Sequence, residues 1–280
     1  AAANAGSDAC PCVGGGETVA QMTARLHAQI EALRFAFVDA AWFCADPAAV
    51  VVPVDELLSD GYAQRRAAGW TAADTDTADV VRGSPVSGSD TVSFQVVDAA
   101  GGAVSFVNSN YMGFGTGIVP EGCGFALQNR GENFSLDPVH PNTLAPGKRP
   151  YHTIIPGMAT HAETGEFWAS FTNMGGFMQP QGHVQLLSAL LDRGADAQAA
   201  VDAPRFCILD GRANGGRVAL EDGIPPAVTS ALRRMGHDVV TVEGEERSYV
   251  FGRAQVIVKD EAGVLWCGSD GRGDGCGIAW

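Results

Sequence analysis

The sequence has 280 residues, 46% of them hydrophobic, so the chain can bury a sizeable core as one large domain or two small ones. Its formal net charge of −14 argues against nucleic acid and anionic membrane surfaces as partners, because both attract basic patches. No apolar run reaches the length of about eighteen residues that a transmembrane helix needs, so no membrane span is expected.

The beginning of the chain lacks a methionine and the basic-then-apolar order of a signal peptide. We interpret it as a processed end or an interior starting point. Among seven cysteines, Cys10 and Cys12 form the only close pair. Their spacing is unusual for a metal or redox motif, so ordinary thiols are favoured over a disulfide there. Six histidines form no HxxxH or HxH pair, and hydrogen-bonding or surface roles are favoured over metal binding. The cysteines do not indicate the cellular compartment of the protein.

The part before residue 91 divides into a lead, two helices and a linker. Residues 1–21 are small and glycine-rich and predict a flexible lead. Apolar residues then recur at helical spacing from Met22 to Phe37, which predicts a helix ending near Cys44. A short helix is expected at about 54–68, followed by a linker at 71–89 that is rich in turn-forming residues.

The linker leads to Asp90 and Thr91, where an alternating strand-like run begins. If the bond between these two residues is cut, the Thr91 hydroxyl becomes a nucleophile and its freed α-amine becomes the base. An α-amine has a reference pKa of roughly 7.7–8.0, so it can accept a proton near neutral pH. The Asp-Thr dipeptide also occurs twice in the linker, so the dipeptide alone does not single out Thr91.

The region after Thr91 alternates strands with helices. A hairpin is expected from strands 92–98 and 103–108, and two further strands from 153–159 and 166–172. Helices are expected at 181–193, after Asp196, and from 225 to 236, and final strands near 239–243, 249–258 and 263–267. Gly175 and Gly176 lie where a strand passes into a helix, so their N–H groups could form an oxyanion hole.

Four segments resemble the γ-glutamyltranspeptidase family in order and spacing. They are residues 105–117 (SFVNSNYMGFGTG), 127–135 (LQNRGENFS), 146–150 (PGKRP) and 174–176 (MGG). The variants at 151–156 (YHTIIP) and 175–183 (GGFMQPQGH) are most similar to the transpeptidase-like amidohydrolases, the branch that includes oxamate amidohydrolase. The resemblance extends over roughly residues 22–280, with 22–90 similar to the end of the large subunit and 91–280 to the small subunit.

The resemblance implies a set of catalytic residues. It implies autocleavage between Asp90 and Thr91, with Thr91 as the nucleophile that forms an acyl-enzyme. It also implies that Gly175 and Gly176 stabilise the oxyanion. It also assigns Ser109 to positioning the amine of the nucleophile, although a strand hydroxyl bonded to backbone is the alternative. No metal or organic cofactor is implied.

Substrate-binding positions depart from the transpeptidase pattern. The positions that grip a γ-glutamyl group in that family are occupied here by Tyr111, Arg130, Asn133, His152 and Thr153. An asparagine at 133 removes the negative charge that would bind an ammonium group. Arg130 has a guanidinium that can form two parallel hydrogen bonds with a carboxylate. A small amide that bears a carboxylate, such as oxamate, is therefore the expected substrate.

The expected fold is α+β: the N-terminal-nucleophile sandwich, two antiparallel sheets between helical layers. Family members carry a long N-terminal region of which this sequence has only the last part, about residues 17–90. Either a second polypeptide or a missing N-terminal region is therefore expected to complete the fold. The alternative function is an uncleaved, catalytically inactive family member that serves as a structural subunit of a larger complex.

Overall fold

The computed structural model describes residues 16–68, 70, 91–209 and 216–280. The helices are α1 (Val19–Phe43), α2 (Val54–Leu57), α3 (Asp60–Ala67), α4 (Met178–Leu191), α5 (Ala197–Asp202), α6 (Pro226–Arg234) and α7 (Arg247–Val250), with 3-10 turns η1 (Arg130–Asn133) and η2 (Gly244–Glu246). The strands are β1 (Thr91–Val97), β2 (Ala103–Ser109), β3 (Gly157–Thr160), β4 (Phe167–Met174), β5 (Phe206–Ile208), β6 (Val218–Glu221), β7 (Val239–Val242), β8 (Arg253–Lys259) and β9 (Leu265–Ser269). No helix among these residues is both long and apolar enough to cross a membrane.

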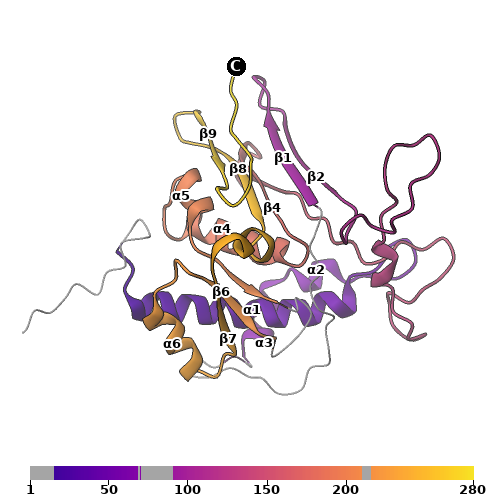
Figure 1. The fold of residues 1–280 in the computed structure, drawn as a ribbon, viewed down its shortest axis with the longest axis horizontal. Coiled ribbons are helices and arrows are strands. Elements are labelled where there is room, and N and C mark those ends of the chain that lie inside the picture. The colour runs from indigo at the N-terminus through magenta and orange to yellow at the C-terminus, as the bar shows by residue number, and fades with distance from the viewer. Residues whose placement is uncertain (1–15, 69, 71–90, 210–215) are drawn as a thin grey trace, which may run out of the picture.

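Two antiparallel layers of strands pack face to face (Figure 1). Strands β1 and β2 form the predicted hairpin, and β3, β4, β8 and β9 form a four-stranded sheet in that spatial order. The hairpin contacts β4 through polar groups: Gln95 Nε2 donates to Thr172 Oγ1 at 3.1 Å and Ser105 Oγ to the Phe171 carbonyl at 3.2 Å. Helices α4 and α5 pack on the four-stranded sheet and supply its apolar core.

The second core lies between the long helix α1 and the sheet β5–β6–β7, seen along the lower part of Figure 1. Thr18 begins α1 with a capping box, in which its side chain accepts from the Gln21 N–H and the Gln21 side chain accepts from the Thr18 N–H. The apolar stripe predicted from the sequence is buried: Met22, Leu26, Ile30, Leu33 and Phe37. It packs on β5, β6 and α6, so α1 is an integral part of this fold.

Opposite its contact with β4, the β1–β2 hairpin presents an apolar face. This face consists of side chains that are each 44–62% exposed: Val92, Phe94, Val96, Val104 and Phe106. The Phe94 and Phe106 rings stack there with centroids 4.9 Å apart. Half-exposed strands usually turn polar residues outward, so an apolar outer face of this kind is typical of a surface that another element covers.

Several predicted boundaries are wrong. The helix expected at 54–68 is two helices, because Ser59 caps a new helix by accepting from the Tyr62 N–H. Residues 153–156 precede β3 without joining it, and residues 247–250 form α7 where a strand was expected. Strands β5 and β6 were missed, and β6 pairs with β7 in parallel, so the sheets are not all antiparallel. Helix α1 begins at Val19, inside the stretch expected to be a flexible lead, whose residues 1–15 lie outside the described part.

Candidate active site

Thr91 is the first residue of β1 and is 2% exposed. It pairs across the hairpin with Ser109, the last residue of β2, and its Oγ1 donates a hydrogen bond to Ser109 Oγ at 2.8 Å. Because the hairpin register fixes this pairing, the two hydroxyls are positioned by backbone hydrogen bonds of the ladder. Asp90, the predicted partner in autocleavage, lies outside the described residues.

Ser109 connects Thr91 to the segment that follows β2. Its Oγ also accepts from the Tyr111 N–H at 3.0 Å. Tyr111 has a φ of 79°, a left-handed conformation that non-glycine residues rarely adopt and that is concentrated at functional sites. The Tyr111 hydroxyl donates to Asn133 Oδ1 at 2.9 Å, which brings η1 to the same place.

Arg130 is buried and bonds to three groups around this site. Its Nε donates to Thr153 Oγ1 at 2.9 Å, its Nη1 to Gln128 Oε1 at 3.2 Å and its Nη2 to the Ser109 carbonyl at 3.1 Å. A guanidinium has five N–H donors, so these bonds leave one N–H on each terminal nitrogen. Burial lowers the pKa of Arg130 from its ordinary value.

The two remaining residues predicted to bind substrate lie beside Arg130. Thr153 receives the Arg130 bond, and His152 is exposed. Burial of its ring, followed by the positive charges of Arg130 and Arg149, lowers the pKa of His152 and favours its neutral form. Asn133 Nδ2 is buried and has no hydrogen-bond partner among the described residues. An unsatisfied buried donor calls for an explanation, and a substrate oxygen would satisfy it.

Gly175 and Gly176 form the turn between β4 and α4, with φ angles of 131° and 60°. Space there is tight, because a Cβ on Gly175 would lie 3.0 Å from the Cα of Gly252. The strand-to-helix placement predicted from the sequence is confirmed, and α4 begins at Met178. The hydrogen bonds described above join Thr91, Ser109 and four of the five predicted substrate-binding residues, Tyr111, Arg130, Asn133 and Thr153, but do not extend to His152 or to the two glycines. Their oxyanion role stays a prediction.

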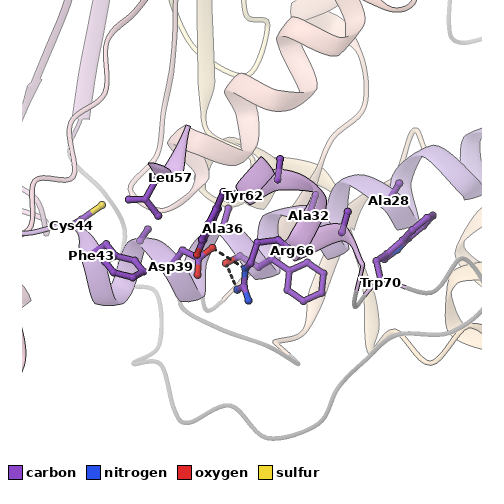
Figure 2. Close-up of a pocket in the computed structure, with 14 residues that line it drawn as sticks. Ala28, Ala32, Ala36, Asp39, Phe43, Cys44, Leu57, Tyr62, Arg66 and Trp70 are labelled. Carbon is purple, nitrogen blue, oxygen red and sulfur yellow. Dashed lines mark hydrogen bonds and ion pairs between the residues drawn. The ribbon is translucent and has the colours of Figure 1, made fainter. Parts of the chain in front are cut away.

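A separate cavity of about 550 Å³ lies between α1 and α3 (Figure 2). Its walls are mostly apolar, with four alanines spaced one helical turn apart on α1 (Ala28, Ala32, Ala36 and Ala40), and it contains an ion pair between Arg66 Nε and Asp39 Oδ2 at 3.0 Å. It shares no lining residue with the Thr91 site. This groove was not predicted from the sequence, because the spacing of small residues on α1 is also that of ordinary close helix packing.

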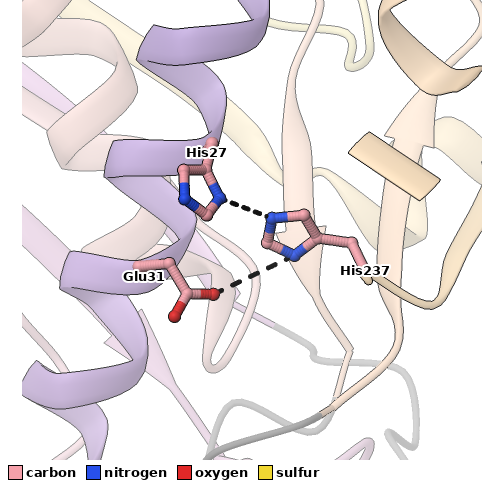
Figure 3. Close-up of side chains that lie close together, drawn as sticks. All are labelled: His27, Glu31 and His237. Atoms are coloured by element: carbon pink, nitrogen blue, oxygen red, sulfur yellow. Dashed lines mark hydrogen bonds and ion pairs between the residues drawn. The ribbon is translucent and has the colours of Figure 1, made fainter. Parts of the chain in front are cut away.

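His27, Glu31 and His237 form a buried cluster that was also not predicted from the sequence (Figure 3). His27 and Glu31 are one turn apart on α1, and His237 lies between α6 and β7. The only available signal was the i, i+4 spacing of His27 and Glu31. His237 is 210 positions beyond His27 in the chain, so no local motif could include all three.

Comparison with known proteins gives the same family as the sequence motifs. The family model described as Gamma-glutamyltranspeptidase matches residues 15–280. The chain is 35% identical over 257 residues to the glutathione hydrolase-like YwrD proenzyme of Bacillus subtilis, covering 90% of this chain and 46% of the relative. It is 35% identical over 262 residues to the oxamate amidohydrolase proenzyme of Klebsiella pneumoniae, covering 91% of this chain and 47% of the relative.

Among solved structures, cephalosporin acylase from Bacillus halodurans superposes with a TM-score of 0.80 at 43% identity, covering 94% of this chain and 46% of that chain. A Pseudomonas nitroreducens gamma-glutamyltranspeptidase mutant, W525D, gives a TM-score of 0.57 at 25% identity, covering 67% of this chain and 98% of that chain. The predicted N-terminal-nucleophile α+β fold class is thereby confirmed. The chain spans about half the length of the curated relatives it matches. With its motifs, its fold and this match in agreement, the chain belongs to the gamma-glutamyltranspeptidase family.

Proposed function

We propose that this protein is an amide hydrolase whose nucleophile is Thr91, released by cleavage of the Asp90–Thr91 bond. The observation that carries the proposal is the pairing of Thr91 Oγ1 with Ser109 Oγ at 2.8 Å, at the first residue of a strand. The names of the relatives support it, because the Bacillus subtilis and Klebsiella pneumoniae proteins are both called proenzymes.

The first reaction would be intramolecular. Thr91 Oγ attacks the Asp90 carbonyl, the peptide nitrogen leaves from that carbon, and an ester links Asp90 to the Thr91 side chain. Water then hydrolyses the ester, which frees the Asp90 carboxylate and the Thr91 hydroxyl and leaves Thr91 with a free α-amine.

In turnover, the α-amine would take the proton from Thr91 Oγ as that oxygen attacks the substrate amide. Collapse of the tetrahedral intermediate gives an acyl ester on Thr91, and the departing amine takes the proton back from the α-ammonium. Water, activated by the same amine, then releases the acid. Gly175 and Gly176 are proposed to donate N–H groups to the oxyanion, a contribution typically worth about 3–4 kcal/mol per donor.

The site favours a small substrate that carries a carboxylate. Arg130 keeps one N–H on each terminal nitrogen, a pair of donors suited to a carboxylate, and Asn133 Nδ2 offers a further donor nearby. Tyr111, His152 and Thr153 would complete the walls, and none of these five side chains supplies a negative charge for an ammonium group. The name of the Klebsiella pneumoniae relative, an oxamate amidohydrolase, agrees with such a substrate.

A second polypeptide or an N-terminal region is proposed to complete the fold. The curated relatives are about twice as long as the part they share with this chain. Two surfaces suit the extra part: the apolar outer face of the β1–β2 hairpin and the groove between α1 and α3. Covering these apolar surfaces would remove them from water and stabilise the complex.

The test is hydrolysis by the whole natural protein of oxamate, of the uncharged diamide of the same size, and of a γ-glutamyl amide. We expect oxamate to have the highest kcat/KM and Thr91→Ala to abolish hydrolysis of every substrate. If the wild-type protein hydrolyses none of the three and its chain stays uncut, the proposal is wrong. The alternative role as a structural subunit would then be favoured.

A further inference from the structure

Three potential metal ligands meet in the buried interior, away from Thr91. His27, Glu31 and His237 are 1%, 2% and 3% exposed. In Figure 3 the His27 and Glu31 side chains extend from the same face of α1 toward the His237 ring. Buried polar side chains need partners, and the arrangement of these three gives each a neighbour of ligand type.

The three side chains lie close together, and the two shortest distances involve different nitrogens of His237, of which one ion can bind only one. His27 Nδ1 lies 2.8 Å from His237 Nε2, and His237 Nδ1 lies 4.0 Å from Glu31 Oε1. One ligand atom from each residue lies within 4.8 Å of the other two. Two atoms bound to one tetrahedral zinc ion are about 3.3 Å apart, so closing the site needs side-chain shifts of up to about 1.5 Å.

The state of the ligands also suits a metal. His237 Nδ1 is buried and has no hydrogen-bond partner among the described residues. A metal ion would supply a partner for this buried ring nitrogen.

Arg34 sets the charge around this cluster. Its Nη1 donates to Glu31 Oε1 at 2.9 Å and its Nη2 to the Gly216 carbonyl at 3.1 Å. This contact orients the Glu31 carboxylate, as groups beyond the ligands of metal sites commonly do. The same positive charge repels a cation, so binding should be weaker than in a site without a neighbouring arginine.

We propose that His27, Glu31 and His237 bind one divalent metal ion of the zinc class. Two imidazoles and one carboxylate form a ligand set that zinc accepts. The bound ion would tie α1 to the segment between α6 and β7, across the core that these elements share. This role is structural and is independent of the proposed amide hydrolysis.

The test is zinc binding to the whole natural protein after removal of metal with a chelator and alkylation of its thiols. Alkylation is needed because Cys44, Cys123, Cys267 and Cys276 are free and exposed and would compete for zinc. We expect one zinc per chain by elemental analysis, a higher melting temperature with zinc, and a cobalt spectrum typical of nitrogen and oxygen ligands.

Variants identify the ligands. Glu31→Gln retains a carbonyl oxygen for Arg34, and His237→Asn retains a polar side chain, so both should fold and both should lower zinc affinity at least about tenfold. His161→Asn, in the exposed turn between β3 and β4, is the matched control and should bind zinc as the wild-type protein does. Absence of saturable binding by the wild-type protein, or equal binding by all four proteins, would overturn the proposal. The cluster would then be a hydrogen-bonded histidine pair.

Discussion

The hydroxyl of Thr91 lies 2.8 Å from the hydroxyl of Ser109, and the two residues are direct partners across the β1–β2 hairpin. A strand register therefore determines the position of the proposed nucleophile. The same Ser109 Oγ accepts from the Tyr111 N–H, and the Ser109 carbonyl accepts from Arg130. One serine thus connects the proposed nucleophile with the proposed substrate-binding side chains.

Removing the Ser109 hydroxyl should slow the chemistry. We expect Ser109→Ala to lower kcat by about 10–100-fold, since a hydrogen bond to a group that becomes charged is worth about 1.5–3 kcal/mol. Ser109→Thr keeps the hydroxyl and should retain most of the activity. The measurement is kcat and KM with the best amide substrate. Equal loss in both variants would mean that the strand packing, and not the hydroxyl, is what matters.

Replacing Arg130 with lysine should weaken recognition of the substrate carboxylate. Lysine cannot form the two parallel hydrogen bonds of a guanidinium, so we expect KM for a carboxylate-bearing amide to rise about 10–100-fold. The uncharged amide of the same size should be affected much less. Arg149→Lys is the control, because the Arg149 side chain is largely exposed and pairs with Asp46. A similar rise in KM for both substrates would contradict the assigned role of Arg130.

Asp270 should be important for stability. Its carboxylate contacts Arg205 Nη2 at 2.7 Å and Arg272 Nη1 at 2.9 Å, and it accepts from the Ala254 N–H at 2.7 Å. Burial acts to raise the pKa of Asp270, but the charges of Arg205 and Arg272 keep it below its ordinary value.

Asp270→Asn leaves two buried guanidinium groups without this counter-charge and should lower the free energy of unfolding by about 3–5 kcal/mol. The exposed Asp274→Asn is the control and should change stability by less than about 0.5 kcal/mol. Urea unfolding of both variants measures the difference. A loss below 1 kcal/mol for Asp270→Asn would show that the network contributes little.

His183 should make the protein sensitive to mild acid. Burial lowers its pKa to about 4, and its ring packs edge-on against Phe171 with centroids 5.2 Å apart. An unfolded histidine has a pKa of about 6.5, so below that pH the unfolded chain binds a proton that the folded chain does not. His183 therefore does not change the free energy of unfolding with pH above pH 6.5. As the pH decreases from 6.5 toward 4, protonation of this residue in the unfolded chain lowers the free energy of unfolding by up to about 3 kcal/mol.

The test of this pH dependence is His183→Leu, which keeps an apolar contact with Phe171 and has no proton to gain. Its unfolding free energy should fall less than that of the wild-type protein between pH 7 and pH 5, with metal removed from both. The other histidines respond equally in the two proteins, so the difference reports on His183. Identical pH dependence would mean that this ring does not titrate as described.

Local periodicity predicted the parts of the fold that have one buried face. The α1 stripe and the β1–β2 alternation are of this kind, because one side of each element packs and the other does not. Strands β5 and β6 were missed because every residue in them is buried, so their sequences show no alternation. The strand expected from 249 begins only at Arg253, after the short helix α7 and Gly252, whose φ is 63°.

The proposed substrate-binding residues could be predicted only through family motifs. Arg130 and Asn133 lie in η1 and Thr153 lies in the segment before β3, and no periodic pattern indicates that these two segments meet. The cluster of His27, Glu31 and His237 had no motif to indicate it and depends on the packing of α1 against the end of α6. Contacts between segments that are far apart in the chain depend on tertiary packing, so local sequence patterns do not predict them.

The most direct test of the account is the intact mass of the whole natural protein under denaturing, reducing conditions, with N-terminal sequencing of each species. We predict two species, one of which begins Thr-Val-Ser at Thr91, and a single uncut species for Thr91→Ala. A wild-type protein that stays uncut while folded would leave Thr91 without a free α-amine. That result would contradict catalysis by this residue and favour the role of a structural subunit.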